Sequence, residues 1–217
     1  MAIATSLNTE GDNIPLWFKV PETFMEINPD ESVEDRIQRI ATSAGRVVGS
    51  TPDWQAHAAL AHEALIKNLA QIDATYAAIF TSRSETLPAR LISALFTVII
   101  RDAPEITGHT MATIAHGLRE PGGRTETLLV DYPAGEACVH GEQHLIRWNN
   151  QEQTARQAQT IFRLPDDRRI AILGITSSCL DDWEDLVGLL DDICHTVTFT
   201  DPADTPTSIG GILDGGL

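Results

Sequence analysis

The sequence predicts one α+β domain, built as a mainly antiparallel β-sheet flanked by helices. Two observations lead to this prediction. Residues 159–200 read as strand, tight turn, strand, helix and strand. Along the whole chain, strand-type segments also outnumber the helical crossovers that parallel pairing requires, which favours antiparallel pairing. The 217 residues, 42% hydrophobic and 21% charged, are enough for one sizeable core.

The clearest pattern lies near the end of the chain. Residues 159–164 are a β-type run, Pro165, Asp166 and Asp167 supply turn chemistry, and residues 170–175 return as a nearly continuous apolar strand. Ser177 and Ser178 are expected to cap the helix that follows. That helix has one apolar stripe at helical spacing, made of Trp183, Leu186, Val187, Leu190 and Ile193. Residues 197–200 are expected to close the unit as a short strand.

The N-terminal part predicts a strand followed by two helices. Residues 1–13 are expected to be a flexible N-terminus, and residues 14–27 an opening strand that Pro21 breaks near a sheet edge. A helix begins after Ser32 and ends at Gly49 and Ser50, with apolar residues on one face. A second helix is predicted over residues 51–71, because Thr51 and Pro52 form a typical helix start.

The middle of the chain predicts four strands and one weaker helix. Residues 74–81 and 91–101 are apolar strands, residues 104–117 a weaker helix, and residues 121–123 a turn. Residues 125–132 and 137–148 form a strand pair joined through Pro133, Ala134 and Gly135. Residues 149–153 are expected to be a polar connection. The domain therefore spans residues 14–201, and residues 202–217 are a flexible Gly- and Pro-rich tail without regular structure.

Charge and cysteine content exclude several classes of function. The formal net charge of −16 repels nucleic acid and anionic lipid, so neither is expected as a partner. No apolar run is long enough to span a membrane, and the first residues lack the features of a signal peptide. Cys138, Cys179 and Cys194 fit neither a disulfide framework nor a zinc ligand set. We expect a cytoplasmic protein with reduced cysteines and no cofactor.

Several landmarks of the chain resemble a loose group of actinobacterial proteins of uncharacterised function. They are Pro21 after an aromatic strand, the run Asp131-Tyr132-Pro133-Ala134-Gly135, and the closing unit with Trp183 on its helix and Val197-Thr198-Phe199 after it. This ending is similar to that of the Mog1/PsbP-like α/β/α sandwich, although two consecutive helices before residue 73 depart from its pattern. The resemblance implies an antiparallel sheet flanked by helices. It implies no catalytic residues, and members of that fold are mostly non-enzymatic binding or assembly factors.

His140, Glu142 and His144 form the strongest candidate for a chemical site. Residues two apart on a strand share a face, so these three side chains are expected to point the same way. Two imidazoles and a carboxylate can ligate a divalent metal with an open position for water. The competing interpretation, which we prefer, is the solvent face of an antiparallel strand, since no supporting partners for a metal site are evident.

Two other candidate sites have structural explanations. His57 and His62 are five residues apart on a predicted helix, so with Glu63 they do not form the metalloprotease pattern. Ser177, Ser178 and Cys179 lie at a strand-to-helix turn where a nucleophile can sit, but they lack the flanking glycines of a hydrolase elbow. We expect the serines to act as caps and Cys179 to be buried.

The sequence favours a non-enzymatic binding, adaptor or assembly protein that acts through contacts with an unknown protein partner. The alternative is a metal-dependent hydrolase that uses His140, Glu142 and His144. Acids near the end of the last helix are unfavourable for the helix dipole, which suggests a solvated face or a contact with a basic partner. An apolar group in the tail is unusual for a flexible segment and suggests a second partner contact. These partner-contact candidates are Asp191, Asp192, Ile209, Ile212, Leu213 and Leu217.

Overall fold

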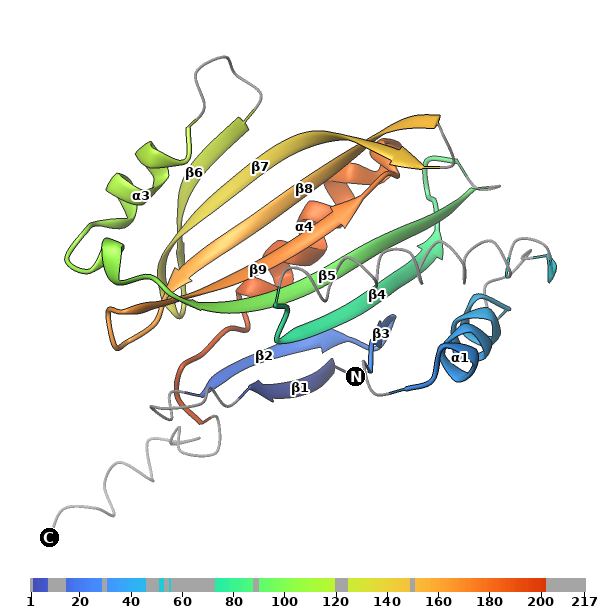
Figure 1. The fold of residues 1–217 in the computed structure, drawn as a ribbon, viewed down its shortest axis with the longest axis horizontal. Helices are drawn as coiled ribbons and strands as arrows, with labels where there is room; N and C mark the ends of the chain where they lie inside the picture. Colours follow the sequence, from blue (N-terminus) through green and yellow to red (C-terminus); the bar gives the residue numbers. More distant parts are fainter. Residues whose placement is uncertain are drawn as a thin grey trace, which may run out of the picture.

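The computed structural model describes residues 2–7, 15–28, 31–45, 51–52, 55, 73–87, 90–119, 125–148 and 151–201. A long antiparallel sheet with helices on both faces forms the molecule (Figure 1). In chain order the elements are β1 (Ala2–Leu7), β2 (Leu16–Pro21), β3 (Phe24–Glu26), α1 (Val33–Gly45), β4 (Tyr76–Arg83), β5 (Leu91–Asp102), the 3₁₀ turn η1 (Pro104–Ile106), α3 (Met111–Gly117), β6 (Thr125–Tyr132), β7 (Gly135–Trp148), β8 (Gln151–Arg163), β9 (Arg169–Ser177), the 3₁₀ turn η2 (Leu180–Asp182) and α4 (Trp183–Cys194).

The main sheet has seven strands in the order β3-β4-β5-β9-β8-β7-β6, and β1 pairs with β2 in a separate ribbon. Every strand pair is antiparallel. The predicted α+β fold with a mainly antiparallel sheet and flanking helices is therefore confirmed. β3 and β6 are the two edge strands, and β7 and β8 extend furthest as a long paired ribbon (Figure 1).

The larger core lies between the sheet and α4. Leu186, Leu190 and Ile193 of α4 are almost fully buried against sheet residues such as Phe162 and Leu173. Trp183 and Val187 pack at the margin of the same core, which confirms the predicted apolar stripe. Leu16, Phe18 and Val20 of β2 also join this core, so the β1–β2 ribbon extends it beyond the sheet.

The other face of the sheet carries α1 and α3. Ile40 of α1 packs on Ala77 and Ile79, which alternate along β4 with residues that face α4. Met111 and Ala115 of α3 pack on Cys138 and Ile161 near the other edge of the sheet. Side chains along each strand thus alternate between an α4 side and an α1/α3 side of the sheet. The position of a residue in its strand therefore decides on which side its side chain lies.

Turn chemistry predicted from the sequence is present at two hairpins. Asp166 Oδ1 accepts hydrogen bonds from the N–H groups of Arg168 and Arg169, and Asp167 takes a φ of 56°. The β6–β7 hairpin turns through Pro133 and Ala134, and Gly135 has a φ of 122°, a conformation that side chains other than glycine's rarely adopt. Both hairpins join neighbouring strands of the sheet, as expected.

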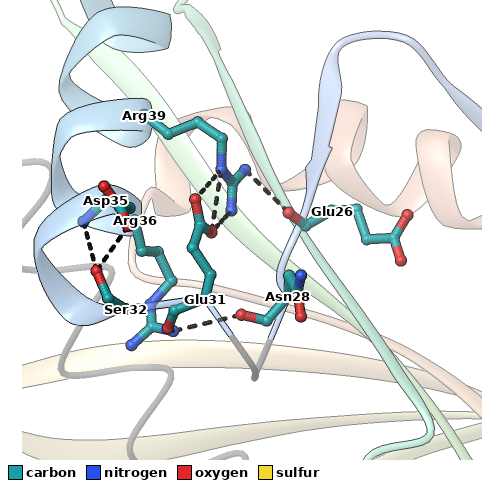
Figure 2. A network of polar contacts seen from close by, with 7 residues as sticks. All are labelled: Glu26, Asn28, Glu31, Ser32, Asp35, Arg36 and Arg39. Atoms are coloured by element: carbon teal, nitrogen blue, oxygen red, sulfur yellow. Dashed lines mark hydrogen bonds and ion pairs between the residues drawn. The ribbon is translucent and has the colours of Figure 1, made fainter.

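A polar network holds the beginning of α1 against β3 (Figure 2). Ser32 Oγ accepts a hydrogen bond from the N–H of Asp35, which is a standard N-terminal cap. Arg39 binds both carboxylate oxygens of Glu31 and donates to the carbonyl of Glu26. Arg36 is buried and donates to the carbonyls of Asn28 and Glu31. The network thus gives backbone carbonyls hydrogen-bond partners where the chain turns from strand to helix.

Several predicted boundaries were wrong. The predicted flexible N-terminus contains strand β1, and the polar connection predicted over residues 149–153 overlaps β8, which begins at Gln151. The single helix predicted over residues 104–117 is a 3₁₀ turn and a shorter helix, separated at Gly108 with its φ of 76°. Residues 197–200 form only one bridge, between Thr198 and Trp17, instead of a strand.

Three other predictions concern residues that are mostly outside the described part. The helix predicted over residues 51–71 is described only at Thr51, Pro52 and Gln55, where the Gln55 N–H donates to the Thr51 carbonyl. The turn at residues 121–123 and the tail at residues 202–217 also lie outside the described residues. Within the described chain, none of the helices combines the length and the apolar character needed to cross a membrane.

Candidate functional site

His140, Glu142 and His144 share one face of β7, as the sequence predicts, and they contact each other. His144 Nε2 lies 2.9 Å from Glu142 Oε1, and His140 Nε2 lies 4.0 Å from Glu142 Oε2. His140 is only 7% exposed, and its Nδ1 lies 3.3 Å from the hydroxyl of Thr127 on β6. One carboxylate therefore lies between two imidazoles on the α1/α3 side of the sheet.

In this arrangement the polar atoms of the three side chains contact each other. The described residues contain no group of three or more His, Cys, Asp or Glu side chains that is placed to hold a metal ion. The carboxylate of Glu142 instead pairs with the ring of His144. The hydroxyl of Thr127 provides a hydrogen-bond partner for the buried ring of His140. The predicted histidine pair of the long helix, His57 and His62 with Glu63, lies outside the described residues.

Ser177 and Ser178 do not cap α4, which corrects the sequence prediction. Ser177 Oγ donates to the carbonyl of Ser93 and accepts from the N–H of Cys179, so its hydroxyl ties the end of β9 to β5. The 3₁₀ turn η2 separates these residues from α4, which starts only at Trp183. Cys179 is buried in the α4-side core, as expected.

A buried carboxylate at the start of α4 was missed by the sequence analysis. Asp182 is 1% exposed, and its Oδ1 accepts a 2.6 Å hydrogen bond from the hydroxyl of Ser84. Ser84 also accepts from the N–H of Leu87, so it links the β4–β5 loop to α4. Among four acids in five residues, the sequence has no signal that distinguishes Asp182 from its exposed neighbours.

The end of α4 is also tied to the sheet through polar groups. The hydroxyl of Tyr132 donates to Asp191 Oδ1 at 2.7 Å, and the Tyr132 ring lies edge-on to the ring of His195. Burial, followed by the hydrogen bond to Asp191, raises the pKa of Tyr132 well above its usual value, so the phenol stays protonated. Asp191, predicted as a partner contact, thus has an internal partner, whereas Asp192 beside it is exposed.

The three cysteines are free and buried, as the sequence predicts. Burial raises the pKa of the Cys194 thiol to about 12 and also raises that of Cys138. A thiol must ionise before it attacks an electrophile or binds a metal. Cys138 and Cys194 are therefore small apolar core residues and poor nucleophiles at neutral pH.

An open cleft of about 760 Å³ lies beyond the N-terminal end of α4. Leu145 projects from β7 into solvent with 72% of its surface exposed. On the same side, Arg156 Nε donates to Gln143 Oε1 at 3.3 Å, so the cleft contains one preformed polar pair. Trp183 contributes an aromatic ring that is only partly covered by the core. The lining residues are Glu126, Gly141, Glu142, Gln143, His144, Leu145, Arg156, Gln157 and Trp183.

The strand alternation explains why this cleft forms. Val139 of β7 packs on the α4-side core, so Gly141, Gln143 and Leu145 face the same side. Since α4 begins at Trp183, the far ends of β7 and β8 extend beyond the helix that covers the rest of this face (Figure 1). An uncovered face with an exposed leucine and a partly buried tryptophan beside polar side chains is typical of a binding surface.

Comparisons with known proteins identify no family. No family model matches the chain, and no curated protein matches it. The solved structures that resemble the chain include LpqN, involved in cell envelope biogenesis of Mycobacterium tuberculosis, with a TM-score of 0.44 and 12% sequence identity over 91% of this chain and 90% of that one.

Proposed function

We propose that this chain is a non-enzymatic binding, adaptor or assembly protein that acts through contacts with a partner protein. The observation that supports this proposal is the open cleft at the end of α4, which is lined by both the exposed Leu145 and the partly buried Trp183. Covering the apolar surface of these two side chains with a partner stabilises the complex. Arg156 and Gln143, which are hydrogen-bonded to each other, line the same cleft and can orient such a partner.

We also infer a Mog1/PsbP-like sandwich and a cytoplasmic location. The placement of α4 on one face of the antiparallel sheet and of α1 and α3 on the other supports the first inference. Three free, buried cysteines support the second, because reduced cysteines are usual in the cytoplasm. The polar atoms of His140, Glu142 and His144 are occupied by each other and by Thr127, so we do not propose the hydrolase function.

The experiment is affinity purification of the tagged full chain from its native cells, followed by mass spectrometry and stoichiometry measurement. We expect a partner at a near-stoichiometric level with the wild-type chain, and its loss with Leu145→Glu. Since Leu145 is 72% exposed, this substitution leaves the fold intact and places a charge in the cleft. An unchanged melting temperature of the variant verifies that its fold is intact.

The matched control is Val33→Glu, which replaces another exposed apolar side chain at the start of α1. The control is expected to retain the partner, because Val33 lies beside the opposite edge strand. If Leu145→Glu retains the partner as well as Val33→Glu does, the cleft is not the binding surface. If the wild-type chain purifies with no stoichiometric protein, the proposed function is wrong.

A further inference from the structure

β6 (Thr125–Tyr132) is the last strand at one edge of the sheet. Its outer side is not paired with another strand in the described part of the chain. Its one neighbour in the sheet is β7, and α3 contacts the face of this hairpin through Cys138 instead of extending the sheet. An edge strand presents backbone N–H and C=O groups that can pair with another extended chain. Proteins that recognise peptides by strand addition use such edges.

The side chains of β6 form a symmetrical pattern. Leu128 and Leu129 lie at its centre and are 62% and 42% exposed, on opposite faces of the sheet. Glu126 and Asp131 lie at equal distances on either side of this pair, and both are exposed. In order, the strand reads acid, any, leucine, leucine, any, acid. Neither of these two acids has a hydrogen bond or an ion pair with any described residue.

The net charge of −16 disfavours pairing with a second copy, because it adds a general repulsion between copies. In an antiparallel pair of two β6 edges the same face of both copies lies on the same side, so Leu128 stands opposite Leu128. In that register Glu126 stands opposite Val130 and Asp131 opposite Thr125, so a second copy gives neither acid a basic partner. The edge is thus open to a strand of complementary charge.

The C-terminal end of the edge strand is anchored to the rest of the fold. Tyr132, the last residue of β6, packs its ring on Phe162 and donates its hydroxyl to Asp191 of α4. The N-terminal half of the strand borders the cleft through Glu126. A preorganised edge loses little conformational entropy when a strand is added to it.

We propose that β6 accepts an extended segment of a partner protein as an added strand, with the pattern basic, any, apolar, apolar, any, basic. The two basic side chains of the segment meet Glu126 and Asp131, and its two apolar side chains cover Leu128 and Leu129. Because the pattern on β6 is symmetrical, either strand direction satisfies it. This inference rests on the proposed function, since it names the class of partner segment that the same end of the molecule recognises.

The test uses the full chain and capped fluorescent peptides. The probe contains the core Arg-Thr-Val-Val-Thr-Arg, the charge control replaces both arginines with glutamates, and the order control contains the same residues as Arg-Arg-Thr-Thr-Val-Val. Fluorescence anisotropy measures Kd. The probe is expected to bind at least about ten-fold more tightly than either control, the scale expected when two cross-strand charge pairs change from attraction to repulsion.

The matched variants separate strand addition from general attraction between a basic peptide and an acidic protein. The double variant Glu126→Lys/Asp131→Lys is expected to bind the arginine probe about ten-fold more weakly and to bind the glutamate peptide instead. Glu34→Lys/Glu85→Lys makes the same change in net charge at exposed acids of α1 and the β4–β5 loop, and it is expected to leave probe binding almost unchanged. Amide hydrogen exchange is expected to slow within residues 126–131 when the probe is bound.

Equal weakening by the two double variants, or equal binding of the order control, would overturn the proposal. So would absence of probe binding to a folded wild-type chain. If the probe does not bind while Leu145→Glu still loses the native partner, the strand-addition inference is wrong and the proposed function stands. If probe binding follows the predicted pattern but no native partner is captured, the proposed function is wrong as stated.

Discussion

At the residue scale, single side chains connect segments that are far apart in the sequence. Ser84 and Asp182 are 98 residues apart, and Tyr132 and Asp191 are 59 apart, yet each pair forms a short hydrogen bond between the rest of the fold and one end of α4. Between these two ends, Leu186, Leu190 and Ile193 bury the apolar stripe. α4 is thus held at both ends by polar contacts and along its length by packing.

Leu190→Ala tests the packing of this stripe. Leu190 is 2% exposed, so truncation removes its buried methyl groups and leaves a cavity between α4 and the sheet. We expect a loss of about 2–5 kcal/mol in the free energy of unfolding, measured by urea denaturation. A loss below about 0.5 kcal/mol, the range of surface substitutions, would contradict the buried position.

At the element scale, edges and junctions of the sheet are stabilised by different means. The β3 edge is joined to α1 through the network of Glu26, Glu31, Arg36 and Arg39 (Figure 2). The β6 edge instead has exposed side chains and a firmly anchored end at Tyr132. One edge strand therefore leads directly into a polar network with the next helix, and the other is the edge proposed above for strand addition.

Arg36→Met tests the network at the β3 edge. Methionine retains most of the buried stem but removes the donors to the carbonyls of Asn28 and Glu31. We expect a loss of about 1–3 kcal/mol in unfolding free energy, because a buried side chain then no longer donates to these two partly buried carbonyls. The control is Arg39→Met, whose side chain is 34% exposed and lies closer to water. Arg39→Met should therefore cost less; an equal or larger cost would show that Arg36 is not the main support.

At the scale of the whole molecule, the net charge of −16 and the exposed apolar side chains at one end of the sheet act together. The charge discourages association between copies, while Leu128, Leu129 and Leu145 provide area for a partner. Both proposed contact surfaces lie around the β6–β7–β8 end of the sheet, where Glu126 belongs to both.

Deletion of residues 203–217 tests whether partner binding also needs the tail. We expect unchanged melting temperature and unchanged partner capture, because ordering a glycine-rich segment costs much conformational entropy. Differential scanning fluorimetry and affinity purification measure the two properties. Lost association at an unchanged melting temperature would instead place the partner contact at Ile209, Ile212, Leu213 or Leu217. A lower melting temperature would show that the tail docks on its own domain.

The sequence by itself determined the elements whose patterns are local. The apolar run of β5, the turn chemistry at Asp166 and Pro133, and the helical spacing of Trp183 to Ile193 each predict an element that the structure contains. Antiparallel pairing followed from the excess of strands. The shared face of His140, Glu142 and His144 followed from the two-residue period of a strand, and their contacts confirm it.

Only the tertiary structure decided the features that depend on distant neighbours. The first half of β8 is polar and lacks strand alternation, yet pairing with β7 satisfies its backbone and makes it a strand. The cleft depends on where α4 begins relative to the ends of β7 and β8, and the open edge depends on the strand order, which places β6 last. Burial of Asp182 and pairing of Asp191 likewise depend on Ser84 and Tyr132, residues too distant along the chain for any local pattern to connect them.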